Sequence, residues 1–77
     1  MSDFTPTDAN LDAFAANIRR ARERKHLSIA DAAKLCGVSL AAWYSDEANK
    51  EMPNLRRLLA IAARLDTTAS KLLRGVI

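Results

Sequence analysis

The chain has 77 residues, a formal net charge of +3 and 49% hydrophobic residues, with two glycines, two prolines and 5% aromatic residues. A chain of this length forms one small domain that buries about 60% of its unfolded surface, so its apolar side chains must share one core and little room is left for an active-site cleft. Because Ala and Leu outweigh the residues that build sheets, the composition predicts an all-α domain.

The first predicted helix runs from about residue 9 to residue 25. Arg24 and Lys25 suit the negative end of its dipole, and His26 tolerates the left-handed backbone that ends a helix. The inward face is an apolar stripe at helical spacing: Leu11, Phe14, Ala15, Ile18 and Ala21.

A short second helix is expected over about 29–35. Ser28 stands three residues before an aspartate, a near match to the capping box that opens helices. Gly37 can adopt the positive φ that ends one, and Cys36 is expected to be a small buried hydrophobe. The residues predicted to face inward are Ala32, Ala33 and Leu35.

Ser39 is the predicted N-cap of a third helix over roughly 40–47. Trp43 is expected to pack in the core rather than to stack on a base, and its indole N–H then needs a partner. The inner side of this helix is predicted to hold Ala42, Trp43 and Asp46, and the outer side Leu40, Ala41, Tyr44 and Ser45. Two short helices joined at a glycine turn have the layout of a helix-turn-helix.

Pro53 disfavours helix before itself, and Asn54 is the expected cap of a fourth helix that ends at about residue 65. Thr68 is expected to cap a short fifth helix that Gly75 ends. The predicted inner stripe of the fourth helix comprises Leu55, Leu58, Leu59, Ala62 and Leu65.

Positive charge is concentrated in two segments. Residues 18–26 carry five Arg or Lys against one Glu, residues 27–52 have a net charge of −2, and residues 53–77 carry five Arg or Lys against one Asp. Two basic segments around a mildly acidic middle can follow the phosphates of DNA, although solvated helix faces show the same pattern.

The sequence also predicts the compartment and the domain organisation. Cys36 is the only cysteine, so no internal disulfide can form, and the acidic, polar N-terminus lacks the pattern of a secretion signal. No apolar run approaches the roughly 20 residues that span a bilayer. We therefore expect a cytoplasmic protein without membrane contact, with a flexible segment at residues 1–8 and a single domain at 9–77.

Several of these positions form an ordered pattern along residues 18–73: Ile18 and Arg22, Leu27-Ser28, Ala33, Gly37-Val38-Ser39, Glu47, Pro53, Leu58, Ala62, Leu65, Thr68 and Leu72-Leu73. Their order and spacing resemble those of the Cro and lambda-repressor-like (XRE-type) helix-turn-helix family. The resemblance implies a compact five-helix DNA-binding domain in which the second and third helices form the DNA-reading unit. It further implies that Arg22 and Glu47 form a structural ion pair between the first and third helices.

The departures from this family concern the reading surface. Relatives usually carry Gln directly after the Ser28 position, where this chain has Ile29, and polar or basic readers early in the third helix, where it has Leu40 and Ala41. The base-reading residues of the family therefore cannot be transferred. The remaining candidates for contacts with phosphates or with thymine methyl groups are Ser39, Leu40, Ala41, Tyr44, Ser45, Asn49, Lys50 and Arg56.

Two functions fit these observations. The first is a small transcription regulator that binds double-stranded DNA, acting as a repressor and as a homodimer through the fifth helix, Val76 and Ile77. The second is a helix-turn-helix scaffold used for protein binding, as a modulator or antitoxin-like partner, through Leu40, Ala41 and Tyr44.

No catalytic function is expected. The chain offers no nucleophile, base and orienting group in a recognisable pattern, and one His and one Cys without further ligands at suitable spacing do not make a zinc site. We therefore expect neither an enzyme nor a cofactor.

Overall fold

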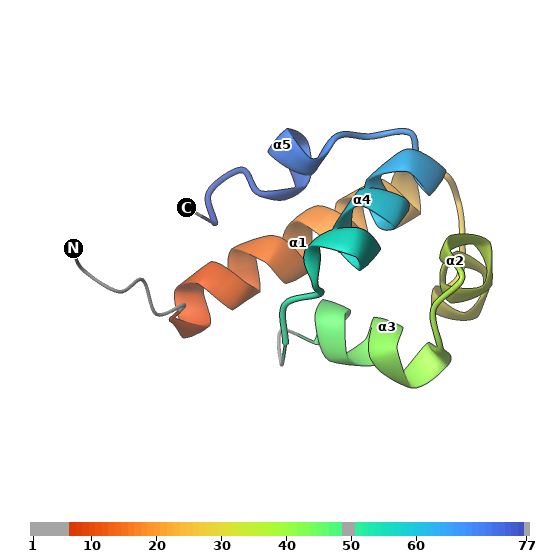
Figure 1. Ribbon diagram of the computed structural model, residues 1–77, viewed down its shortest axis with the longest axis horizontal. Helices are drawn as coiled ribbons and strands as arrows, with labels where there is room; N and C mark the ends of the chain where they lie inside the picture. The colour runs from red at the N-terminus through yellow and green to blue at the C-terminus, as the bar shows by residue number, and fades with distance from the viewer. Residues whose placement is uncertain (1–6, 49–50, 77) are drawn as a thin grey trace.

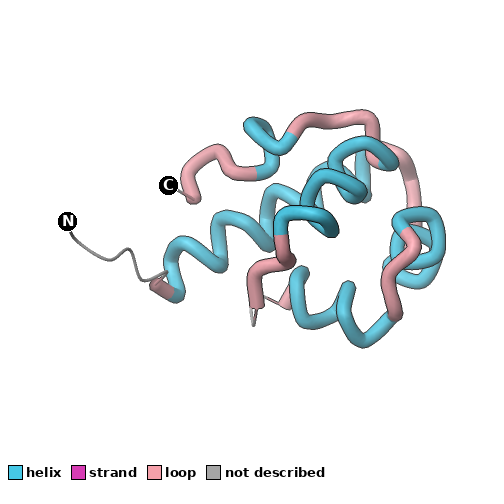
Figure 2. The backbone as a smooth tube through the Cα atoms, in the orientation of Figure 1, coloured by secondary structure: helices cyan, strands magenta, loops and turns pink. Residues whose placement is uncertain are grey.

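The computed structural model describes residues 7–48 and 51–76. In this part of the chain all regular structure is helical, which confirms the all-α prediction (Figure 2). The five helices are α1 Asp8–Arg24, α2 Ile29–Cys36, α3 Leu40–Glu47, α4 Leu55–Arg64 and α5 Ala69–Leu72. The long α1 contacts both α3 and α5, which lie on opposite sides of it, and α2 packs against α3 and α4 (Figure 1).

Each helix is preceded by an N-cap residue whose side chain accepts a hydrogen bond from the backbone N–H three residues later. This bond satisfies one of the free amides of the first turn. The four predicted caps are confirmed: Ser28, Ser39, Asn54 and Thr68. The fifth, Thr7, forms a reciprocal capping box with Asn10, and α1 therefore begins at Asp8, one residue earlier than predicted.

Three left-handed residues turn the chain between helices. Gly37 at φ 71° and His26 at φ 58° have the predicted conformation, whereas Asp66 at φ 55° was not predicted. The Nζ of Lys25 lies 2.6 Å from Oδ2 of Asp66, so the corner after α1 and the corner after α4 are in contact.

The core is centred on fully buried side chains of α1, α3 and α4: Phe14, Ile18, Trp43 and Ile61. The stripe predicted for α1 is buried except at Leu11, which is partly exposed. Cys36 is buried, as expected.

Three leucines predicted to face inward are exposed instead: Leu35, Leu55 and Leu59. Leu35 and Leu59 each stand one residue from a buried position, which corresponds to about 100° around the helix. Leu55 lies in the first turn of α4 and is 68% exposed. The inner face of α4 is completed by Ile61, which the predicted stripe omitted.

Val76, predicted to lie on a dimer surface, is buried in the chain's own core. Gly75 has a positive φ of 78° that turns the chain after α5. The backbone carbonyl of Val76 then accepts a hydrogen bond of 2.5 Å from Nδ2 of Asn10, which fixes this segment against α1. Ile77 lies outside the described residues.

Candidate nucleic-acid interface

The residues predicted to contact DNA lie mainly on α3 and at its N-cap, where the exposed ones are Ser39, Leu40, Ala41 and Tyr44. Leu40 is 49% exposed and Tyr44, four residues later on the same face, is 54% exposed. Ser45 is partly buried, and Asn49 and Lys50 lie outside the described residues. The Ser39 hydroxyl accepts a hydrogen bond of 3.0 Å from the Ala42 N–H, so this side chain serves as the helix cap.

The two charged residues of α3 are buried at its C-terminal end. Asp46 is 0% exposed and Glu47 is also buried. Because α3 carries no other charged residue, its exposed face has no charge of either sign.

Glu47 links α3 to α1 through a bidentate ion pair with Arg22. Nη2 of Arg22 lies 2.7 Å from Oε1 of Glu47, and Nε lies 3.0 Å from Oε2. The remaining guanidinium nitrogen donates to the Leu27 carbonyl at 2.8 Å, so the pair also fixes the corner between α1 and α2. The structure therefore brings together the two residues for which the resemblance implies an ion pair.

Two further donors complete the surroundings of Glu47. The Trp43 indole N–H donates to Oε2 at 2.6 Å, which supplies the partner that a buried tryptophan needs. Arg19 donates from Nε to Oε1 and from Nη2 to the Glu47 backbone carbonyl, each at 3.3 Å. Sequence reasoning did not identify Arg19, although its position one turn before Arg22 on α1 is a usable signal.

Asp46 links α3 to α4 through one of its two carboxylate oxygens. Its Oδ1 accepts a hydrogen bond of 2.8 Å from Nη2 of Arg57, whereas its Oδ2 and the Arg57 Nε are buried without a hydrogen-bond partner in residues 7–48 and 51–76. The sequence placed Asp46 on the inner side of the helix but gave no partner for it.

The two neighbouring carboxylates have opposite pKa shifts. Burial raises the pKa of Asp46, and the hydrogen bond and charge of Arg57 only partly offset this effect. Burial also tends to raise the pKa of Glu47, but the hydrogen bonds from Arg22 and Trp43 and the charge of Arg22 together lower it below its ordinary value. The hydrogen bond to Glu47 in turn raises the pKa of Arg22.

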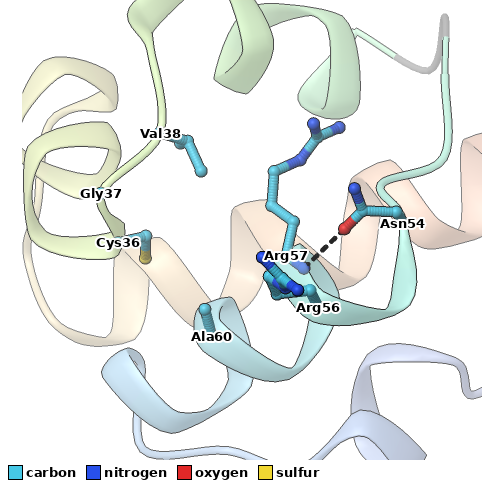
Figure 3. Close-up of a pocket in the computed structure, with 7 residues that line it drawn as sticks. All are labelled: Cys36, Gly37, Val38, Asn54, Arg56, Arg57 and Ala60. Carbon is cyan, nitrogen blue, oxygen red and sulfur yellow. Dashed lines mark hydrogen bonds between the residues drawn. The ribbon is translucent and has the colours of Figure 1, made fainter.

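A hollow of about 230 Å³ lies between the α2–α3 turn and the start of α4. Figure 3 shows Arg57 reaching from α4 toward α3, while its backbone N–H is held by Asn54. Arg56, which is exposed, contributes a cation beside the turn that precedes α3. The residues that line the hollow are Cys36, Gly37, Val38, Asn54, Arg56, Arg57 and Ala60.

Burial raises the pKa of the Cys36 thiol at the edge of this hollow, and the charge of Arg64 only partly offsets this. Within residues 7–48 and 51–76, no three His, Cys, Asp or Glu side chains are grouped as metal ligands. The helices of the same residues include none with the length and apolar character to cross a bilayer.

The arrangement thus combines a fixed helix with an uncharged outer face and a cation near each end. Arg56 stands by the turn before α3. Arg19 contacts the last residue of α3, and its side chain remains 52% exposed despite these contacts. The two cations can contact the phosphates of a polyanion, while the exposed Glu51, whose backbone N–H donates to the Ser45 carbonyl, places one negative charge near the C-terminal end of α3.

Comparison with known proteins gives one family match and several similar structures. A family model described as a helix-turn-helix domain matches residues 13–74. No curated protein sequence matches the chain.

Three solved structures illustrate the likeness. The restriction-modification controller protein C.AhdI from Aeromonas hydrophila has a TM-score of 0.78 and 28% identity, with 83% of this chain and 97% of that chain covered. The hypothetical transcription factor NHTF from Neisseria has a TM-score of 0.79 and 26% identity, covering 95% and 83%. The hydroxypropylphosphonic acid epoxidase from S. wedmorenis has a TM-score of 0.73 and 26% identity, covering 86% of this chain but only 35% of the epoxidase.

The fold is therefore that of transcription regulators and also of one part of a larger enzyme. The family match spans most of the chain, and it agrees with the Cro and lambda-repressor-like pattern of the sequence. The chain belongs to the helix-turn-helix domain family.

Proposed function

We propose that this protein is a DNA-binding transcription regulator that acts as a repressor and as a homodimer. The observation that supports the proposal most directly is the distribution of charge on α3. Its two carboxylates are buried in ion pairs, and its outer face is exposed and free of negative charge. An exposed carboxylate on this face would repel DNA phosphates.

The similar structures support the same class of function. Two of the three are a restriction-modification controller protein and a hypothetical transcription factor, and each is matched over most of its own length. The epoxidase matches over about a third of its length, so its likeness concerns a single part of that enzyme.

A dimer is proposed because a single α3 with few phosphate contacts binds DNA weakly. Two copies on half-sites about one helical turn apart combine their contacts at high effective concentration. Since Val76 is buried in its own core, this dimer must use other residues. A repressor role requires only that the bound dimer cover DNA that the polymerase needs.

The test is a mobility shift of the purified protein on DNA from around its own gene, with random DNA as competitor. Arg56→Ala should weaken binding to all sequences to a similar extent, because a phosphate contact carries no sequence information. Arg74→Ala is the matched control: this exposed arginine follows α5, and its hydrogen bonds with Asn17 and Lys71 use its backbone. Absence of a shift at low salt and micromolar protein would contradict the proposal.

The second candidate function, protein binding through α3, is favoured by the exposure of Leu40 and Tyr44. The salt dependence of binding distinguishes the two candidate functions. DNA binding through phosphates weakens by orders of magnitude as salt rises, whereas an apolar contact between proteins changes little.

A further inference from the structure

The exposed face of α3 has little capacity for hydrogen bonding as well as no charge. Leu40 and Ala41 offer only carbon atoms, and the Ser39 hydroxyl is engaged in capping the helix. Tyr44 presents an aromatic ring with a single hydroxyl. The bidentate hydrogen bonds by which Arg, Lys, Asn or Gln identify guanine or adenine are therefore not available from this face.

One feature of the major groove suits such a face. Thymine presents a C5 methyl group there beside its O4 acceptor, whereas cytosine carries only hydrogen at C5 and the purines present no methyl group. An apolar side chain gains contact with this methyl group, and every base pair without one lacks that contact. Discrimination then comes from the methyl group itself.

We propose that Leu40 and Tyr44 make α3 a reader of pyrimidine C5 methyl groups, so that the protein prefers thymine-rich major grooves and also accepts 5-methylcytosine. The inference rests on the proposed DNA binding and specifies its substrate class. Leu40 and Tyr44 lie four residues apart on one face, so they can contact neighbouring base pairs together.

Charge favours DNA over a protein as the occupant of this face. Arg56 stands beside the turn before α3, and Arg19, half exposed, stands at its other end. A face without charge between two cations complements a groove whose floor is apolar at the methyl groups and whose edges are phosphates.

The probe is a pair of duplexes of equal length, alternating dA·dT and alternating dA·dU, which differ in the major groove only by the methyl group. The affinity of the full chain at low salt should be at least about fourfold higher for the thymine duplex, the effect of burying one methyl group. In a duplex of mixed sequence, replacement of cytosine by 5-methylcytosine should strengthen binding by a similar factor.

Leu40→Ala should bring the ratio of thymine to uracil affinity close to one without unfolding the protein, because half of the Leu40 side chain is already in solvent. Leu59→Ala is the matched control, since Leu59 is 51% exposed but lies on α4, outside this face. It should leave the ratio unchanged. Thermal melts of each variant show whether the fold is retained.

The failures of the two proposals are distinguishable. Equal binding of the thymine and uracil duplexes overturns methyl reading and leaves DNA binding in place. A ratio that Leu40→Ala does not lower overturns the role of Leu40, and a ratio that survives Leu40→Ala combined with Tyr44→Ala overturns the assignment to this face. No binding to any duplex, together with a protein contact that Leu40→Ala weakens, overturns both and identifies α3 as a protein-docking face.

Discussion

The two carboxylates at the end of α3 are adjacent in sequence but are stabilised very differently. Among the described residues, Glu47 has donors from three side chains and a lowered pKa, whereas Asp46 has one donor, an oxygen without a hydrogen-bond partner and a raised pKa. The contact of α3 with α1 is thus a complete polar network, and its contact with α4 is a partial one. The comparison indicates that α1, more than α4, fixes the position of the helix proposed to enter the groove.

The largest loss of stability is expected when the guanidinium group that pairs with Glu47 is removed. Arg22→Met keeps the apolar stem but leaves Glu47 buried without its bidentate partner, so the free energy of unfolding should fall by about 3 kcal/mol. Urea unfolding followed by the fluorescence of Trp43, the only tryptophan, measures this directly. Arg20→Met is the control: the side chain of this exposed arginine on the same helix donates to Asn17, and a change within about 0.5 kcal/mol is expected.

A direct comparison of the two carboxylates uses amides of nearly the same shape. Glu47→Gln replaces the charged acceptor of the Arg22 hydrogen bonds with a neutral amide, so the free energy of unfolding should fall by about 2 kcal/mol. Asp46→Asn removes a charge that burial already disfavours and keeps an oxygen for Arg57, a partly exposed residue, so a cost of at most about 1 kcal/mol is expected. Equal losses in the two variants would refute the difference between the networks.

The smallest effect is the opposite pH dependence of the two groups. The lowered pKa of Glu47 gives stability that is present above about pH 4 and is lost as the pH falls through the folded-state value. The raised pKa of Asp46 gives stability that is present below about pH 4 and is lost as the pH rises through its folded-state value. Relative to the unmodified chain, Glu47→Gln should therefore flatten the acid side of the stability curve, and Asp46→Asn should steepen it. Parallel curves for the two variants would show that the opposite shifts are absent.

Local features were predictable from the sequence because their causes are local. Ser28, Ser39, Asn54 and Thr68 cap helices through bonds that span three residues, and Gly37 turns the chain by its own conformational freedom. Thr7 was missed because its capping partner is Asn10, which differs from the usual acidic or Gln residue.

The features that were missed depend on how the helices pack. A rotation of the helix by one residue position decides whether Leu35 and Leu59 face the core. The spacing of apolar residues alone does not determine this rotation. The partner of Asp46 is 11 residues away on another helix, so no periodic pattern identifies it. The Arg22–Glu47 pair was anticipated only through the family resemblance, which supplies tertiary information that the single sequence lacks. The DNA-contacting roles of the α3 residues and Arg56 stay predictions.

The claim that α3 presents an uncharged face to DNA, with phosphates held by flanking cations, is tested most directly by the salt dependence of DNA affinity. In fluorescence anisotropy titrations of a labelled duplex from about 50 to about 200 mM salt, log K should fall linearly with log salt, with a slope near −0.9 per phosphate contact. Arg56→Ala should reduce the magnitude of that slope by about one. An affinity that does not change with salt, or no measurable binding at the lowest concentration, would contradict the account.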